Sequence, residues 1–531
     1  MWLLVASSSV EAQVRIVDIQ NADLIEVTDD SSGVVRRMTG NVRLRQDTTS
    51  IRADRVIEYE RQRLYLLSGN VRIVSGRDTL TARTVTYDAN TKVSIAEGNV
   101  RVGNGESTLY APSTRYDSRA EVSAFEGGGR ILNEGATLIA PSGTYDSSRR
   151  FARLDGPVSL YDSTGTLHAA RGTYDARVQR ADFAGEVRLW RPDARMHADS
   201  VVYFRRTERA RAYGQVVLQR IGESGTIERV GQAPADSSAR TLLFGEELLF
   251  DGQEDRARVR GSETRDPLLL LLKADSTGRV DTTLARAPRI DVFEEATEGG
   301  DTLRVLIAAG GAQLTQRDLA ARADSVHLVR RESRAGGPSA DRFGFFGQTR
   351  PRVWADGSQL TADTLLASAR AGAVDTVFAI GAPFAAQLDS TLGRVQQLKG
   401  QRMRALFDQD RIRQLDVWPN AEAIYHLADG EGRFESVIEI TSDSLAFGFE
   451  DGEVRNVFGA TGNQGTQTAG NLVTGRKRLS GFAFSPREAP TAPSVLDVDG
   501  WEAIWLRTYG PSLQDLLPLL PTTASTPRGD P

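Results

Sequence analysis

The sequence of 531 residues contains no cysteine and only four histidines. Without cysteine there is no disulfide framework, no thiolate metal site and no cysteine nucleophile. The histidines, His168, His197, His327 and His426, stand in neither a nucleophile-elbow nor a zinc-binding motif. A Walker A motif and a dinucleotide-binding fingerprint are also absent. These absences predict a protein that is not an enzyme and that holds no metal ion or cofactor.

Long apolar runs and a basic excess are missing as well. The longest apolar run, residues 267–272, is far shorter than the roughly 18–20 residues that a membrane-spanning helix needs. The formal net charge is −5, and arginine is common where lysine is rare. Nucleic-acid binding depends on neutralising phosphates with lysine and arginine, so no nucleic-acid partner is expected.

The N-terminus resembles the end of an export signal. Residues 1–10 form a short apolar stretch, and Val10 and Ala12 fit a signal-peptidase site. We therefore expect residues 1–12 to be a signal-peptide remnant that is cleaved after Ala12, with the basic n-region upstream of Met1. Export to the periplasm would follow. The alternative is an irregular N-terminal strand.

What the sequence does contain is a repeat of 29 residues. Its markers are three series in phase: glycines, alanines and tyrosines. The glycines are Gly40, Gly69, Gly98, Gly127, Gly156, Gly185 and Gly214. The other series are Ala53, Ala82, Ala111, Ala140, Ala169 and Ala198, and Tyr87, Tyr116, Tyr145, Tyr174 and Tyr203. Self-similarity at a fixed period indicates a repeat architecture in which each unit packs on its neighbours.

Apolar residues stand two and four positions after the glycines and two positions before the alanines. Spacing by two is typical of a strand with one buried face. The resulting candidate interior is Val42, Leu44, Ile51, Val71, Ile73, Leu80, Val100, Val102, Leu109, Ile131, Leu138, Val158, Leu160, Leu167, Val187, Leu189, Met196, Val216 and Leu218. The Gly127 copy is the weak one, since it offers only Gly129 and Ile131.

The parity of the apolar positions changes at each marker glycine. Leu64 and Leu66 precede Gly69, whereas Val71 and Ile73 follow it. A shift by one residue turns a strand over unless a bulge or corner absorbs it, and glycine suits such a corner. We therefore predict two antiparallel strands per repeat, each folded at its middle, which stack into a V-shaped trough. The marker glycines are its structural corners.

Short turns complete each repeat. Aspartate follows the marker tyrosine at Asp88, Asp117 and Asp146, at the start of a hairpin connection. We interpret the tyrosine as closing the core and the aspartate as beginning the turn, which is a structural role. His168 and His197 are one period apart; a metal pair is possible, but a solvated pair on the outer face is the favoured interpretation.

Residues 13–218 form the regular repeat region. Beyond them the 29-residue spacing becomes irregular over residues 219–510, but the same short motifs recur. Examples are the Ala-Asp phrases at Ala323 and Ala362. Candidate loop excursions are residues 220–240, 262–287 and 331–348. The end, residues 511–531, is rich in proline and threonine and is expected to be a disordered tail.

Three phrases point to a known family. They are Asn21-Ala-Asp-Leu-Ile-Glu, Gly40-Asn-Val-Arg-Leu and the chain of Ala-Asp and Gly-Asn-Val units. Together they resemble the OstA-like (organic solvent tolerance A) family over residues 15–218, and more loosely to about residue 460, where residues 413–425 are similar to long OstA-like proteins. The resemblance implies an antiparallel β-jellyroll, or β-taco, open along one seam, whose apolar interior shields lipid A acyl chains.

The resemblance also implies partners. These are lipopolysaccharide or another amphipathic lipid, other OstA-like jellyroll proteins joined by edge-strand addition, and the outer-membrane translocon. Two alternatives remain open: a structural or adhesin-like β-solenoid with a sealed core, and a carbohydrate-active β-helix enzyme. An open trough that the protein's own side chains do not fill would favour the lipid-binding hypothesis.

Overall fold

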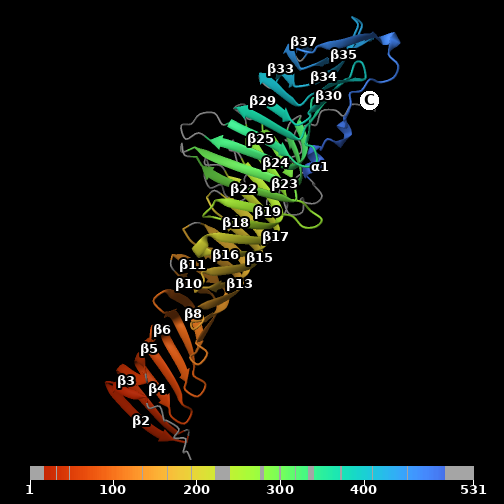
Figure 1. Ribbon diagram of the computed structural model, residues 1–531. Helices are drawn as coiled ribbons and strands as arrows, with labels where there is room; N and C mark the ends of the chain where they lie inside the picture. The colour runs from red at the N-terminus through yellow and green to blue at the C-terminus, as the bar shows by residue number, and fades with distance from the viewer. Residues whose placement is uncertain are drawn as a thin grey trace, which may run out of the picture. The chain divides into compact units, whose positions relative to one another are not determined.

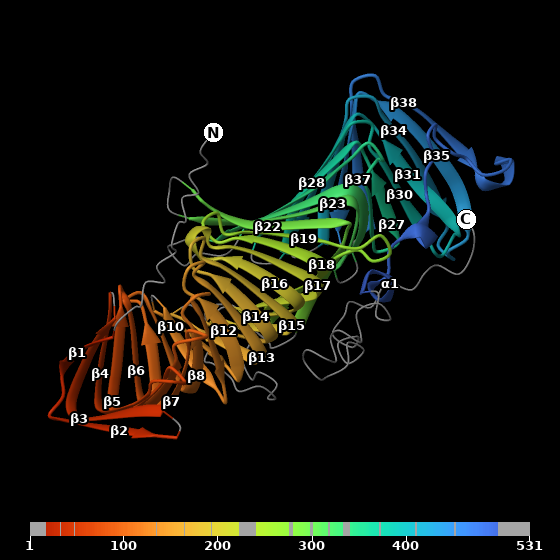
Figure 2. The ribbon, with the colours of Figure 1, turned by 90° about the horizontal axis from the view of Figure 1, so that it is seen from below.

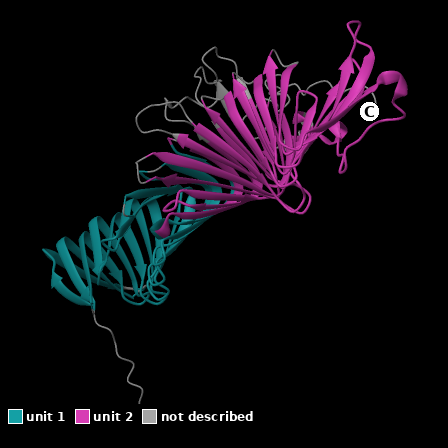
Figure 3. Ribbon diagram, turned by 45° about the horizontal axis from the view of Figure 1, so that its top comes forward, with its two compact units in different colours: residues 1–191, 202–206 teal, residues 192–201, 207–531 magenta. Residues whose placement is uncertain are grey.

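The computed structural model describes residues 17–31, 33–46, 48–133, 135–163, 165–192, 194–221, 240–274, 280–297, 301–316, 319–332, 340–370, 373–408, 411–450 and 453–496. The expected signal peptide and the C-terminal tail lie outside these residues. The chain divides into two compact units: residues 1–191 with 202–206 form unit 1, and residues 192–201 with 207–531 form unit 2 (Figure 3). No helix of the described residues has the length and apolar character to cross a membrane.

Unit 1 is a stack of antiparallel strands (Figure 1). The strands are β1 (Asp18–Asn21), β2 (Leu24–Asp30), β3 (Gly33–Gln46), β4 (Thr49–Tyr59), β5 (Leu64–Ser75), β6 (Asp78–Asp88), β7 (Val93–Gly103), β8 (Ser107–Asp117), β9 (Val122–Glu126), β10 (Gly129–Asn133), β11 (Ala136–Ala140), β12 (Ser142–Asp146), β13 (Phe151–Tyr161), β14 (Thr166–Asp175) and β15 (Arg180–Trp190). Strand β16 (Ala194–Phe204) and the turn η1 (Arg205–Thr207) follow at the division between the units.

Each long strand bends at its middle, as the parity change predicts. Between β5 and β6, Ser68 pairs with Thr84 and Val71 pairs with Ala82. Two residues of β5 therefore face one residue of β6, which defines a β-bulge. The two residues are Gly69 and Asn70, with φ of 75° and 46°. The left-handed backbone explains the glycine, and we call this bend the crease.

A side chain from the preceding strand supports the crease. Asn70 Nδ2 donates a hydrogen bond to Asp54 Oδ2 at 2.9 Å. A Cβ at Gly69 would lie 2.3 Å from the same carboxylate oxygen. Asp23 and Asn41 make the same contact at Gly40, so at these two repeats the aspartate of one strand supports the crease of the next.

The Gly127 copy differs because an aromatic ring fills its crease. The strand is interrupted between β9 and β10, and Phe125 is 2% exposed there. A Cβ at Gly129 would lie 2.3 Å from the Phe125 ring, and one at Gly143 would lie 2.9 Å from it. This repeat has glycine at position 129 because the Phe125 ring occupies the space that an apolar side chain would fill.

The hairpin aspartates have the structural role predicted for them. Asp88 Oδ1 accepts hydrogen bonds from the backbone N–H groups of Asn90 and Thr91 at 2.8 and 3.3 Å. Asp117 makes the corresponding bonds at the next hairpin. The bond from the Asn90 N–H lowers the pKa of Asp88.

Unit 2 continues the same architecture with both long and short strands. Its strands are β17 (Arg209–Ile221), β18 (Arg240–Asp251), β19 (Arg256–Arg260), β20 (Leu268–Ala274), β21 (Val280–Arg286), β22 (Arg289–Ala296), β23 (Thr302–Gln316), β24 (Leu319–Glu332), β25 (Ala340–Phe346), β26 (Arg352–Ala355), β27 (Ser358–Thr361), β28 (Thr364–Arg370), β29 (Ala373–Ile380), β30 (Phe384–Asp389), β31 (Arg394–Lys399), β32 (Arg402–Asp408), β33 (Arg411–Trp418), β34 (Ala421–Ala428), β35 (Phe434–Ser442), β36 (Ser444–Glu450), β37 (Glu453–Ala460) and β38 (Gln464–Ala469). The turns η2 (Gly470–Leu472) and η3 (Pro486–Glu488) and the short helix α1 (Ala492–Leu496) end the described chain.

Two of the predicted loop excursions are wrong in part. Residues 262–287 contain the paired strands β20 and β21, and Leu268, Leu269 and Leu270 are 0–1% exposed. A continuous apolar run is typical of a fully buried strand, which the surrounding glycine and charge obscure. Residues 340–346 of the third excursion form β25. Most of the first excursion lies outside the described residues.

Residues 477–496, which we call the strap, run back along unit 2 after β38 (Figure 2). Gln397 Nε2 donates to the Lys477 carbonyl at 3.0 Å, and its Oε1 accepts from the Leu479 N–H at 2.9 Å. Gln359 holds the Ala483 carbonyl and the Ser485 N–H in the same way, at 3.1 and 2.7 Å. The two buried amides are satisfied by the strap backbone, so the strap is an integral part of the fold.

Candidate functional site

The inner face of unit 1 has one aliphatic wall. Each member of this wall is the register partner of the next across neighbouring strands. In order, the wall is Leu44, Ile51, Ile73, Leu80, Val102, Leu109, Ile131, Leu138, Leu160, Leu167 and Leu189. All eleven belong to the candidate interior predicted from the sequence, and no polar residue interrupts them.

The other residues of the candidate interior fall into two groups. Those two positions after the glycines form the floor at the crease: Val42, Val71, Val100, Val158 and Val216 are 1% exposed, and Val187 is 0% exposed. The floor valines are packed core, since Val71 faces Ala82 and Val100 faces Ala111. Met196 is 7% exposed, and Leu218 is half-buried on β17 of unit 2.

The second wall is built from tyrosines and small residues, which alternate from Tyr87 onward. In register order it is Tyr65, Tyr87, Ser94, Tyr116, Ser123, Tyr145, Ala152, Tyr174 and Ala181. From the sequence, the repeat tyrosines from Tyr87 onward are interpreted as core-closing residues and are not placed at a site. Their strict 29-residue spacing is the signal that identifies the wall, and Tyr65 lies outside that series.

A cavity of about 370 Å³ lies between the two walls. Seven predicted residues line it, namely Leu44, Ile51, Ile73, Leu80, Val102, Leu109 and Ile131. Tyr65, Tyr87, Tyr116 and Tyr145 line the opposite side. A cavity of about 150 Å³ with an apolar lining is already enough to hold benzene in another protein. The space in unit 1 therefore suffices for a flexible hydrocarbon segment, and the side chains of the described residues leave it unfilled.

The mouth of the cavity is polar. Burial, followed by the charges of Asp78 and Glu121, raises the pKa of Tyr116 to about 12. Burial and the nearby charge of Glu121 also raise the pKa of Asp78. The phenol of Tyr116 is therefore protonated at neutral pH and remains a hydrogen-bond donor at the edge of an apolar space.

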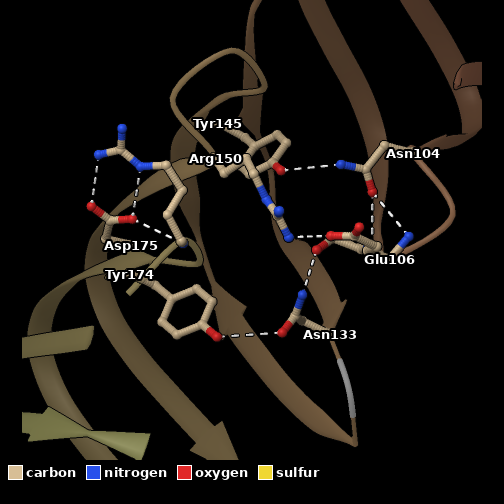
Figure 4. Close-up of polar contacts among 9 residues, drawn as sticks. Asn104, Glu106, Asn133, Tyr145, Arg150, Tyr174 and Asp175 are labelled. Carbon is tan, nitrogen blue, oxygen red and sulfur yellow. Dashed lines mark hydrogen bonds and ion pairs between the residues drawn. The ribbon is translucent and has the colours of Figure 1, made fainter. Parts of the chain in front are cut away.

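Polar contacts join the rims of the two walls at one end of the cavity (Figure 4). Asn104 Nδ2 donates to the Tyr145 hydroxyl at 3.5 Å, and the Tyr174 hydroxyl donates to Asn133 Oδ1 at 3.4 Å. Between them Arg150 forms an ion pair with Glu106. We call these three contacts the seam bridge, because they connect the hairpins of opposite walls.

The predicted solvated histidine pair is wrong for His197, which is 2% exposed. His168 is half-buried, with its Nδ1 2.7 Å from Ser159 Oγ and its ring against Trp190. The alternation of apolar positions correctly placed each histidine on the face opposite to the wall. It does not predict which residues cover that face. Within the described residues, no group of histidine, aspartate and glutamate is arranged to hold a metal ion.

Part of the chain is similar to known proteins. Residues 15–170 match the family model of OstA-like proteins. Over these residues the chain is similar to OstA-like proteins. No curated protein sequence matches it. Among solved structures it is similar to LptH of Pseudomonas aeruginosa, described as the LptA-homologous periplasmic component of the lipopolysaccharide transport device. That match has 20% sequence identity and a TM-score of 0.19, and it covers 20% of this chain and 81% of LptH.

The aliphatic wall of unit 1 has a counterpart in unit 2, beyond the residues that match the family model. Its members are again successive register partners: Leu218, Leu243, Leu269, Ala285, Leu314, Ala321, Val353, Leu360, Ala385, Leu398, Ala423 and Ile440. Only Leu218 was predicted. Because neighbouring residues of a strand alternate in direction, Gln359 and Gln397 point away from this wall. The strap therefore covers the face opposite to this wall, and the wall itself is largely buried, with Leu269 and Ala321 at 1% and 0% exposed.

Proposed function

We propose that unit 1 binds the acyl chains of lipopolysaccharide, or of another amphipathic lipid, and carries it through the periplasm as a non-catalytic bridge component. The observation that supports this most is the unfilled cavity between an uninterrupted aliphatic wall and a tyrosine wall. The family match agrees with it, as does the similarity to a periplasmic component of a lipopolysaccharide transport device.

The apolar wall supplies the driving force for binding. Burial of each CH₂ group contributes about 0.8 kcal/mol, so ten such groups contribute about 8 kcal/mol before the cost of ordering the chain. A solenoid with a sealed core offers no such gain, because its interior is already filled. The unfilled cavity thus favours the lipid-binding hypothesis over the sealed structural solenoid.

An edge strand in each unit suits partner proteins of the same kind. In unit 1, strand β2 pairs with β3, and its Leu24, Ile25 and Val27 are 45–63% exposed. In unit 2, β37 pairs with β36, and Phe458 is 66% exposed. Exposed strands with apolar side chains are natural sites for strand addition. We propose that other jellyroll proteins of the bridge, and the outer-membrane translocon, dock there.

Photo-crosslinking tests the lipid site. A photoreactive amino acid replaces Ile73 or Val102 of the aliphatic wall, and purified lipopolysaccharide is added before irradiation. Arg72 and Arg101 are exposed neighbours on the opposite face and serve as matched controls. We expect lipid adducts from the two wall positions and none from the controls, as measured by mass spectrometry. Adducts from the arginine positions alone would contradict the proposal.

A further inference from the structure

The residues at the mouth of the cavity have a charge bias. Among the described residues that line the cavity, Asp78 and Glu121 are the charged ones, and lysine, arginine and histidine are absent. The rest of the polar lining consists mainly of hydroxyl and amide groups, such as Thr49, Ser107 and Asn104. The mouth thus offers many neutral hydrogen-bond donors and acceptors together with negative charge.

The two carboxylates belong to opposite rims. Asp78 begins β6 at the rim of the aliphatic wall, whereas Glu121 lies in the turn between β8 and β9 at the rim of the tyrosine wall. Each is close enough to act on the other, since the charge of Glu121 contributes to the raised pKa of Asp78. A head group held at the mouth would therefore lie between two negative charges.

Two neighbouring cations lie outside the cavity lining, although the charge of Arg150 acts on Tyr145 at the edge of the cavity. Arg150 is held by Glu106 in the seam bridge. Lys92 lies at the rim of the tyrosine wall, with its ammonium 5.8 Å from the centroid of the Tyr87 ring. Neither residue is part of the cavity lining. A phosphate monoester at the mouth would meet like charge, whereas an uncharged sugar would find hydroxyl partners.

We propose that the cavity selects amphiphiles whose head group at the mouth is uncharged and rich in hydroxyl groups, and that it discriminates against phosphate at that position. This inference rests on the proposed lipid-binding function and narrows its ligand class. For a lipid that carries both sugars and phosphates, the phosphates would be held away from Asp78 and Glu121 while the acyl chains enter.

The test compares two probes with the same dodecyl chain. Dodecyl maltoside has a neutral sugar head group and dodecyl phosphate has an anionic one. Binding to the full chain is measured by isothermal titration calorimetry below the micelle-forming concentrations. We expect dodecyl maltoside to bind about tenfold more tightly, because each nearby carboxylate repels the phosphate. Raising the salt concentration should reduce this difference by screening the charges.

Substitution of the carboxylates provides the second measurement. The double variant Asp78→Asn with Glu121→Gln should bind dodecyl phosphate about tenfold more tightly than the unaltered chain and dodecyl maltoside within about twofold. Glu97→Gln removes an exposed carboxylate from the outer side of β7 and is the matched control, with no expected change.

The outcomes separate the two proposals. If neither probe binds, the lipid-binding function itself is wrong. If both probes bind equally well, at low and high salt, the cavity is a lipid site without this selectivity and the present inference is overturned. The salt comparison uses the unaltered protein, so it decides the question even if the double variant does not fold.

Discussion

At the scale of single residues, each bend of the sheet depends on a small set of side chains. The glycine at the crease supplies the left-handed backbone, and the following residue continues it. At Gly98 the neighbouring side chain is Arg83 in place of the aspartate found at Gly69. The backbone requirement is thus shared by the repeats, while the residue packed against the glycine varies.

Replacement of Gly98 tests this dependence. A Cβ at Gly98 would lie 2.8 Å from the Arg83 Cβ, and φ there is 78°. Gly98→Val should therefore destabilise the protein by about 2 kcal/mol or more. Gly105→Val is the control, because Gly105 has φ of 90° with nothing within 4 Å of its Cβ position. Thermal melting followed by circular dichroism should show a larger loss for Gly98→Val. Equal losses would contradict a role for the packing contact.

At the scale of elements, the hairpins decide how widely the two walls separate. The hairpin between β7 and β8 carries Asn104 and Glu106, and the turn between β12 and β13 carries Arg150. The Glu106 and Arg150 side chains are 45% and 38% exposed. Exposed pairs contribute about 0.2–1 kcal/mol, so the seam bridge is a contact that opens readily.

Removal of one charge should loosen these hairpins without unfolding the sheet. We expect Glu106→Gln to increase amide hydrogen exchange about two- to fivefold in residues 103–107 and 147–150, which corresponds to the loss of an exposed ion pair. Asp182→Asn removes a pair with Arg180 within one strand and is the matched control. Unchanged exchange in Glu106→Gln would show that the seam bridge does not hold the rims together.

At the scale of the whole molecule, both units contain hairpins that begin with an aspartate whose carboxylate accepts hydrogen bonds from backbone N–H groups of the turn. The pKa of Asp88 is lowered mainly by the backbone N–H of Asn90, that of Asp175 by the guanidinium of Arg177, and that of Asp429 by the backbone N–H of Arg433. Each aspartate begins a hairpin. The response of the chain to acid is therefore spread along its length.

Thermal stability should fall as the pH drops below the ordinary aspartate pKa of about 3.9. The folded pKa values are lowered, so the unfolded chain binds protons first; the stabilisation is present above that pH and is lost as the pH falls through the folded values. The triple variant Asp88→Asn, Asp175→Asn and Asp429→Asn keeps an accepting oxygen but does not titrate there. Melting temperatures measured from pH 7 to about pH 2.5 should fall less steeply for the variant. An equal slope would exclude these three residues as the cause.

Parity along the strands was enough to predict the all-β fold, the crease and the aliphatic wall of unit 1. It was not enough to separate Val71, packed on the floor, from Ile73, which lines the cavity. Both are apolar and lie on the same face, and only the depth of the crease distinguishes them. The wall of unit 2 was not predicted because loops of different length make the spacing of its residues in the sequence irregular. The wall is recognised only from the register of the paired strands.

Contacts between distant segments were also beyond reach of the sequence. Gln359 and Gln397 are buried because the strap covers them. The strap residues that they contact are 124 residues further along the chain for Gln359 and 82 for Gln397. The burial of His197 was missed for a related reason. The apolar pattern of one strand predicts which side chains share a face, but it does not predict which other segments cover that face.

The uninterrupted aliphatic wall has a kinetic consequence. Neighbouring strands are about 4.8 Å apart, and each would offer nearly the same hydrocarbon surface to the acyl chain that we propose binds there. A chain displaced by one strand exchanges one set of contacts for an equivalent set, so its binding free energy changes little along the wall. Motion along the wall then resembles one-dimensional diffusion over a nearly level surface. A single polar residue in the wall would create a barrier to that motion without greatly weakening the average affinity.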